Sequence, residues 1–260
     1  MILPALPERH FVSLNNSRIV ILMILAGIIL AASSCRGQSP GGGKAGLNSG
    51  RLLMLEVSLP ESKYANEDQR AAFFQHALQR IAALPGVESA GAVSTNPLSD
   101  DKQSVTFTIE PMSDDAIDSI PAGFNVVSPG YFQTLMANLI QGRTITENDK
   151  RDGVRVVVIN ETLARRFFPD ESPIGKRVQF DDLEEQDSWV EIVGVVGDIK
   201  QADADDPEPE FYMSYLQAPP LVMTVIVQSA ADAKEMADRV QREIKAVDGE
   251  VNVSNIGTMK

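Results

Sequence analysis

The sequence is poor in the residues that usually carry catalysis or bind metals. It has one cysteine, Cys35, and two histidines, His10 and His76, in 260 residues. A single cysteine excludes a disulfide within the chain, and a body poor in thiols is compatible with an oxidising compartment. Two histidines on either side of a predicted membrane segment cannot pair around a metal. Ser128 and Ser172 would be nucleophiles only beside a base, which His76 alone could supply, so triad chemistry is disfavoured.

The sequence also lacks an excess of positive charge. Twenty-three Lys and Arg residues face 36 Asp and Glu residues, which gives a net charge of −13. Nucleic-acid-binding proteins carry a basic patch or stripe, so this class is excluded. The stretch "GQSPGGGKAG" does not have the spacing of a phosphate-binding loop, and no nucleotide partner is expected. At 43% hydrophobic and 23% charged residues, the chain is globular.

Only one long apolar run is present, from Ile19 to Ala32. We assign 1–18 to an N-terminal leader, 19–34 to a membrane anchor or signal segment, and 35–50 to a Gly/Ser-rich linker. Sixteen helical residues would span about 24 Å, which is short for a bilayer core of about 30 Å. Three interpretations stay open: an uncleaved anchor, a lipoprotein signal that leaves Cys35 as the lipid attachment site, and an ordinary cleaved signal. All three place the remaining chain outside the cytoplasm.

The two ends of the remaining chain repeat one pattern, a strand, an amphipathic helix and a second strand. The first unit starts at Arg51, and its helix begins with a cap at Asn66 and ends before Pro85 and Gly86. The closing unit has the strand "LVMTVIVQS", a helix that we expect Ser229 to cap, and the strand "EVNVSNI". Two such units form a ferredoxin-like (porter-like) β-α-β sandwich.

The middle of the chain has a different texture, so the fold class is α+β, with a small mixed α/β subdomain inserted into the sandwich. We place the sandwich at residues 51–112 and 208–260 and the insertion at 113–207. Within the insertion, Ser128 is expected to cap a helix that opens on Pro129. The stretches "IGKRVQF" and "WVEIVGVVGDI" are expected to form a hairpin.

Polar residues of the insertion have structural as well as functional interpretations. Asn160 with Glu161 could line a pocket, but a helix cap and a favourable helix-dipole charge fit better. Arg165 and Arg166 could bind an anion, yet they suit the C-terminal end of the same helix. Gly194, Gly197 and Asp198 favour a turn or bulge over a phosphate loop. The acids of 181–187 and 203–210 could bind calcium but lack the spacing of a calcium loop. His76 is expected at the surface. Leu163 and Phe167 are expected to be buried against the valine-rich strands.

Several motifs, in order along the chain, resemble one known family. They are "VSPGYFQTL", "GRTITENDK", "VVVINETLARRFFPDESPIGKRV", "VEIVGVVGDIKQ" and "FYMSYLQAP". Together they resemble the MacB-like periplasmic core domain of ABC-type permeases with FtsX-like transmembrane helices. The resemblance runs from about Arg51 to Lys260 and implies a porter-like half with a smaller inserted half. The sequence contains at most one membrane segment and no ATPase motif, so the transport machinery itself is not expected here.

The resemblance implies a membrane-tethered, extracytoplasmic, non-enzymatic domain at the bacterial inner membrane. In the family, such domains contact partner proteins and relay movement. The expected partners are the membrane and either a complete permease or a periplasmic protein, and no catalytic, metal or cofactor-binding residue is assigned. Two alternatives remain: a ligand-binding lipoprotein with a cleft between the subdomains, and a small extracytoplasmic hydrolase.

Overall fold

The computed structural model describes residues 52–97, 103–110, 121–180, 189–199 and 206–259. The predicted leader, membrane segment, linker, His10 and Cys35 lie outside the described residues, as do the acids of 181–187. All the described residues belong to one compact unit. No helix in the described ranges has the length and apolar character needed to span a membrane.

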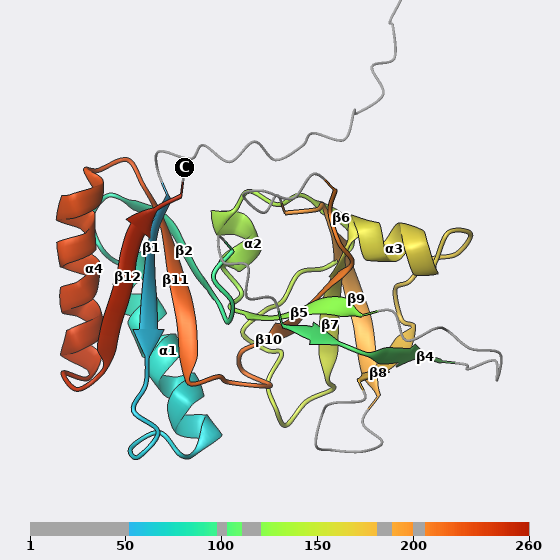
Figure 1. Ribbon diagram of the computed structural model, residues 1–260, viewed down its shortest axis with the longest axis horizontal. Helices are drawn as coiled ribbons and strands as arrows, with labels where there is room; N and C mark the ends of the chain where they lie inside the picture. Colours follow the sequence, from blue (N-terminus) through green and yellow to red (C-terminus); the bar gives the residue numbers. More distant parts are fainter. Residues whose placement is uncertain (1–51, 98–102, 111–120, 181–188, 200–205, 260) are drawn as a thin grey trace, which may run out of the picture. The chain divides into compact units, whose positions relative to one another are not determined.

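The first and last strands of the described chain share one half-sheet, in the order β12-β1-β11-β2 (Figure 1). Every neighbouring pair in this first half-sheet is antiparallel. The order is the one in which two β-α-β units interleave, and the first strands of the two predicted units, β1 and β11, lie side by side in one sheet as a β-α-β sandwich requires. The four strands are β1 (Leu52–Ser58), β2 (Val87–Val93), β11 (Val222–Ser229) and β12 (Asn252–Thr258).

Two helices, α1 (Glu67–Ala82) and α4 (Ala233–Val247), complete the two β-α-β units. The Asn66 side chain accepts a hydrogen bond from the backbone N–H of Asp68, as expected of an N-cap. The prediction for α4 is wrong by three residues, because Asp232 rather than Ser229 is its N-cap. Ser229 instead donates from Oγ to the Gly86 carbonyl and so links β11 to the turn before β2.

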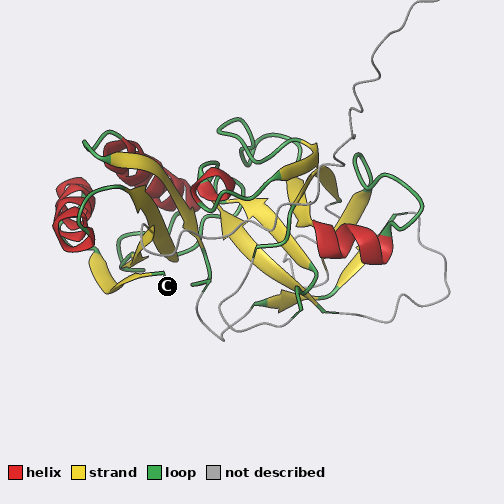
Figure 2. Ribbon diagram, turned by 90° about the horizontal axis from the view of Figure 1, so that it is seen from above, coloured by secondary structure: helices red, strands yellow, loops and turns green. Residues whose placement is uncertain are grey.

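The remaining strands form a second half-sheet, which continues from β2 in the order β5-β10-β7-β9-β8-β4. β2 and β5, where the two half-sheets meet, share one residue pair in the described strand ladder, Val93 and Val127. The expected hairpin of β8 and β9 is confirmed as an antiparallel pair. The strands are β3 (Ser104–Val105), β4 (Phe107–Ile109), β5 (Ala122–Val127), β6 (Leu139–Gly142), β7 (Val156–Asn160), β8 (Arg177–Phe180), β9 (Val190–Val196) and β10 (Glu210–Ser214). Its helices are α2 (Tyr131–Thr134) and α3 (Glu161–Phe167), which Figure 2 shows in red together with α1 and α4.

The strand pairing moves the boundaries that the sequence suggested for an inserted subdomain. β4 pairs with β8, and β10 pairs with β5 and β7. Both β4 and β10 fall within the ranges 51–112 and 208–260, yet they hydrogen-bond with strands of 113–207. A division into two subdomains, which remains a proposal, would place the boundaries near Ser94 and Pro220 instead of at 112 and 208.

The core lies on both faces of the strands, because side chains alternate from one face to the other. In β1, Leu53 and Leu55 join the cluster that α1 and α4 cover, while Leu52 and Met54 join a second cluster. The second cluster includes Tyr131, Phe132 and Leu135 of the α2 segment. The Ser128 cap is wrong: α2 is capped at Gly130 without a side-chain bond, and Ser128 Oγ accepts from the Ala92 N–H at 2.8 Å.

An ion-pair cluster fastens the loop after β1 to the end of α4. Lys63 lies 2.8 Å from Asp248 and 3.0 Å from Glu250, and Tyr64 donates to Asp248 at 2.8 Å. The hydrogen bond from Lys63, with further ones from the Glu250 N–H and Tyr64, lowers the pKa of Asp248 to about 2. Because the folded-state pKa is depressed, this contribution to stability is present above the ordinary pKa near 4 and is lost as the pH falls toward 2.

We therefore expect Asp248→Asn to destabilise the protein near neutral pH and to have little effect near pH 2. Urea unfolding of the parent and the variant at both pH values measures the difference. Lys63→Met should shrink the same pH dependence, since it removes the first partner. A constant difference between parent and Asp248→Asn across the whole range would contradict this assignment.

Candidate functional site at the junction of the half-sheets

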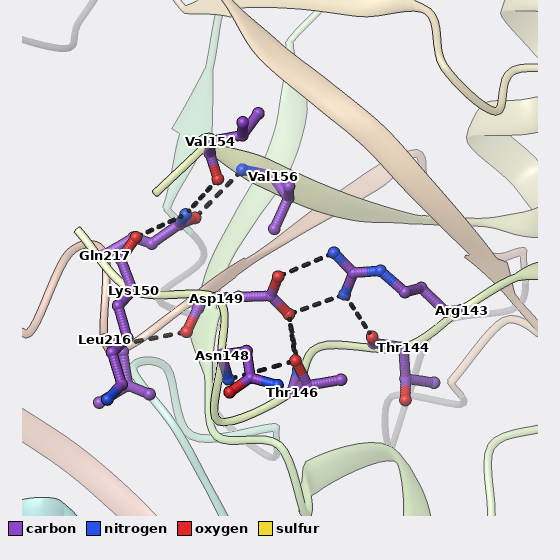
Figure 3. Close-up of polar contacts among 11 residues, drawn as sticks. Arg143, Thr144, Thr146, Asn148, Asp149, Lys150, Val154, Val156, Leu216 and Gln217 are labelled. Carbon is purple, nitrogen blue, oxygen red and sulfur yellow. Dashed lines mark hydrogen bonds and ion pairs between the residues drawn. The ribbon is translucent and has the colours of Figure 1, made fainter. Parts of the chain in front are cut away.

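The loop of residues 143–155, here the junction loop, is shaped by one ion pair (Figure 3). Arg143 donates from both terminal nitrogens to the two carboxylate oxygens of Asp149, each at 2.8 Å. Thr146 donates to the same carboxylate from its backbone N–H at 2.7 Å and from its hydroxyl at 2.9 Å. A carboxylate with four such donors fixes both ends of the turn at once.

The geometry is reflected in the protonation of the pair. Burial by itself would raise the pKa of Asp149, but the hydrogen bonds from Arg143 and Thr146 outweigh it and hold that pKa below its ordinary value. The same hydrogen bond raises the pKa of Arg143. Both groups stay charged across the physiological pH range, so the pair is a structural ion pair and not a proton-transfer site.

Gln217, in the connector between β10 and β11, closes the junction loop from the other side (Figure 3). Its amide nitrogen donates to the carbonyls of Val154 at 2.9 Å and Lys150 at 3.3 Å. Its amide oxygen accepts from the Val156 N–H at 3.1 Å. Gln217 is buried. Its three hydrogen bonds satisfy backbone groups that would otherwise be costly to bury.

The junction loop also contacts helix α1, which belongs to the first half-sheet. Arg151 forms an ion pair with Glu67, and the Gln75 amide donates to Glu147 at 3.1 Å. The connector makes a parallel contact, because Arg70 of α1 donates to the Pro219 carbonyl at 3.5 Å. The loop and the connector therefore bind to each other and to α1.

We expect Asp149→Asn to lower the free energy of unfolding by about 1–2 kcal/mol, because Arg143 loses its bidentate partner and is itself half exposed to screening water. A double-mutant cycle with Arg143→Met isolates the coupling between the two side chains. The matched control is the exposed pair Glu161 and Arg165, where the coupling should be below about half a kcal/mol. Equal coupling energies in the two cycles would show that the Arg143–Asp149 ion pair is no stronger than an exposed one.

Asn160 lies at a second polar junction, where β7 ends, α3 begins and β10 begins. Its side-chain oxygen accepts from the Leu163 N–H at 2.9 Å, which confirms the expected helix cap, and also from the Glu210 N–H at 3.0 Å. Its side-chain nitrogen donates to the Glu208 carbonyl at 2.7 Å. The residue is 1% exposed, so its polar groups are used inside the fold.

The charged residues next to Asn160 pair with one another. Glu161 and Arg165 form an ion pair at 3.3 Å, one helical turn apart. Asp198 accepts from the N–H and the hydroxyl of Thr162, both at 2.9 Å, and so adds a second cap to α3. The Arg166 guanidinium lies over the Phe167 ring at 5.8 Å. These contacts support the structural interpretation of all four residues.

The other candidates from the sequence are spread over the fold. His76 is exposed on α1, beside a shallow hollow that Gln79, Arg80 and Val247 also line. Ser172 accepts hydrogen bonds from the Gln141 amide at 2.7 Å and from the Ile174 N–H at 3.3 Å. Within the described ranges, no group of three or more His, Cys, Asp or Glu side chains is placed to hold a metal ion. Every buried side-chain nitrogen or oxygen there has a hydrogen-bond partner.

Sequence reasoning missed Arg143, Asp149 and Gln217 as a group. The motif "GRTITENDK" contains the first two, but they lie six positions apart in a loop, and no helix or strand periodicity pairs them. Gln217 lies more than sixty residues away from the carbonyls that it binds. The signal in the sequence is an acidic residue between a glycine-arginine step and a valine-rich strand.

The described residues form a sheet-rich mixed α/β domain in which the junction loop contacts helix α1 and the connector between β10 and β11. The model of the MacB-like periplasmic core domain matches residues 42–243, and the chain belongs to that family. No curated relative matches the chain.

Solved structures share the fold. The periplasmic region of MacB from Actinobacillus actinomycetemcomitans is 17% identical, with a TM-score of 0.51 over 78% of this chain and 88% of that one. The extracellular domain of the noncanonical ABC-type transporter YknZ from Gram-positive bacteria is 19% identical, with a TM-score of 0.50 over 78% and 100%. A domain of a putative permease from Porphyromonas gingivalis is 13% identical, with a TM-score of 0.51 over 82% and 92%.

Proposed function

We propose that the protein is a membrane-tethered, extracytoplasmic and non-catalytic domain that relays movement within a transport complex. Its partner would be a complete permease or a periplasmic protein that binds it in trans. Family membership supports the extracytoplasmic location, because the related structures are periplasmic or extracellular parts of transporters and permeases. The apolar run from Ile19 to Ala32 supports the tether.

The observation that carries the relay is the junction loop. A relay needs two bodies whose movements are coupled through a defined contact. Arg151 and Glu147 connect this loop to Glu67 and Gln75 of α1, and Gln217 connects it to the strand connector. A force applied to one half-sheet would therefore reach the other through a few polar contacts that can break and re-form.

The tether is tested by fractionating cells that express the full chain with a C-terminal tag. We expect the tag in the membrane fraction and open to protease in spheroplasts. Deletion of residues 2–35 should release the protein, and Cys35→Ser should release it only if Cys35 carries a lipid. A tag that stays protected in intact spheroplasts and fractionates with the cytoplasm would overturn the proposal.

The relay is tested by the distance between two spin labels, at Ala72 on α1 and Asp170 after α3, in a Cys35→Ser background. We expect Arg151→Ala with Glu147→Ala to broaden the distance distribution. The matched control, Glu235→Ala with Arg239→Ala, removes an ion pair at 3.1 Å within α4 and should leave the distribution unchanged. If the junction variant matches the parent, the loop does not couple the two half-sheets.

Two alternatives are tested on the same purified protein. A thermal-shift screen with periplasmic small molecules would support a ligand-binding lipoprotein, since a ligand raises the apparent stability. Turnover of ester, phosphate or peptide substrates would support a hydrolase. The proposal expects neither result.

A further inference from the structure

Exposed apolar side chains gather in one short segment of the second half-sheet. Met136, Leu139 and Ile140, here the apolar patch, are 38%, 47% and 52% exposed. They make up half of the six large hydrophobic residues that are exposed in the described ranges. Among the described strands β6 pairs with β9 alone, and the register shifts at Ile140. A cluster of exposed apolar side chains often marks a surface that binds a protein or a membrane.

The backbone at Met136 closes the C-terminal end of α2 and presents this side chain at the surface. Met136 follows the short helix α2 and has φ of 53°, in the left-handed region that glycine or asparagine usually occupies at this position. A methionine there adopts an uncommon conformation and also leaves an apolar side chain in water. The helix end accounts for the conformation, because the Met136 N–H donates to the Gln133 carbonyl at 3.0 Å and the Ala137 N–H to the Phe132 carbonyl at 2.9 Å. The 38% exposed side chain is the part that packing within the domain does not explain.

The chemistry of the segment restricts what can cover the patch. Residues 121–142 contain no Asp, Glu, Lys, Arg or His, although the chain as a whole has 36 acids and 23 bases. A protein or nucleic acid that docks by charge complementarity would find no charged contacts on this segment. The boundary between lipid headgroups and acyl chains requires none, because apolar side chains provide the attraction.

The patch lies on the side of the domain where the described chain begins and ends. The Leu52 carbonyl accepts from the Met259 N–H at 3.0 Å, and both residues share a hydrophobic cluster with Leu135 and Ala137, which flank Met136. Figure 1 shows α2 and β6 toward the same side as the start of β1 and the end of β12. A Gly/Ser-rich chain as long as residues 33–51 has an average span of about 25 Å.

We propose that Met136, Leu139 and Ile140 form a lipid-contact patch, with which the domain rests on the outer surface of the bilayer that tethers it. The inference rests on the proposed tether and adds an orientation to it. The net charge of −13 opposes binding to anionic lipid, so contact should be strongest on zwitterionic lipid and weaken as anionic lipid is added.

The test uses the full chain in vesicles. Because Cys35 is the only cysteine, a Cys35→Ser background allows one new cysteine to be labelled. An environment-sensitive fluorophore is placed at Ile140→Cys or at the control Val222→Cys. Val222 is 40% exposed and pairs with Ser58, at the opposite end of β1 from Leu52. Quenching is measured with nitroxide-bearing lipid in phosphatidylcholine vesicles, with and without phosphatidylglycerol, and with iodide in the water.

We expect the lipid-bound nitroxide to quench the label at Ile140 several-fold more than the label at Val222, and phosphatidylglycerol to reduce the difference. Leu139→Gln with Met136→Gln should abolish the preference while the protein stays in the vesicle fraction. Equal lipid quenching at the two sites in tethered protein would overturn the inference and leave the tether intact. The label at Ile140 could instead become shielded from both quenchers as the protein concentration rises. That result would also overturn the inference, because a second copy of the chain would then cover the patch. Protein that does not stay with vesicles in this Cys35→Ser background would overturn the anchor by residues 19–34 first, because the same substitution also removes a lipid at Cys35.

Discussion

Gly194→Ala is expected to lower the free energy of unfolding by about 3 kcal/mol. A Cβ atom at this position would lie 1.9 Å from the Arg143 carbonyl oxygen and 2.9 Å from its carbon. The neighbour is backbone and not the end of a flexible side chain, so the chain itself must move. Arg143 also donates its N–H to the Val193 carbonyl at 2.9 Å, so the movement would break this bond and pull the guanidinium from Asp149.

Gly197→Ala is the matched control, because it makes the same chemical change three residues later. The nearest atom to a Cβ there is the Asn138 carbonyl oxygen at 3.8 Å, which is ordinary contact. We expect a change within about half a kcal/mol. Urea unfolding followed by circular dichroism measures both variants. If the two glycines tolerate alanine equally, Arg143 does not cross β9 as closely as described.

The sequence predicted the first half-sheet well because its information is local. The period of the apolar residues in α4, with Met236, Val240 and Ile244 buried, sets the helix and the face that it packs. Two such units have few ways to interleave, so the order β12-β1-β11-β2 follows. The cap of α4 was misplaced because Ser229 and Asp232 are both good caps, and only the bond from Ser229 to the Gly86 carbonyl decides between them.

The second half-sheet could not be derived in the same way, because its pairings are long-range. β4 pairs with β8 about seventy residues later, and β10 runs parallel to β5. No local pattern distinguishes these partners from others of similar composition. The same limit applies to Phe167, which was expected against the valine-rich strands. It is only partly buried and packs edge-on against Phe107 of β4, with ring centroids 5.1 Å apart, while Leu163 is fully buried as expected.

Asn160→Ala has the other large expected effect, and the structure revises its size. From the sequence alone, the loss of a helix cap predicts about 1 kcal/mol. The structure adds the bond from the buried Glu210 N–H and the bond to the Glu208 carbonyl. A buried donor without a partner costs about 1–3 kcal/mol. We therefore expect a total loss of about 3 kcal/mol, more than for truncation of the partly buried Phe167.

Two further variants separate this structural role from a catalytic one. Glu161→Ala removes the neighbouring side chain, which is 43% exposed, and should change stability by less than about half a kcal/mol. Asn160→Asp keeps both acceptor contacts and loses only the donor to the Glu208 carbonyl, so it should be less stable than the parent near neutral pH. Protonation of the new carboxyl group restores a donor, and the deficit should shrink as the pH falls. A deficit that does not depend on pH, or an Asn160→Ala variant that melts like the parent, would mean that Asn160 does not join α3 to β10.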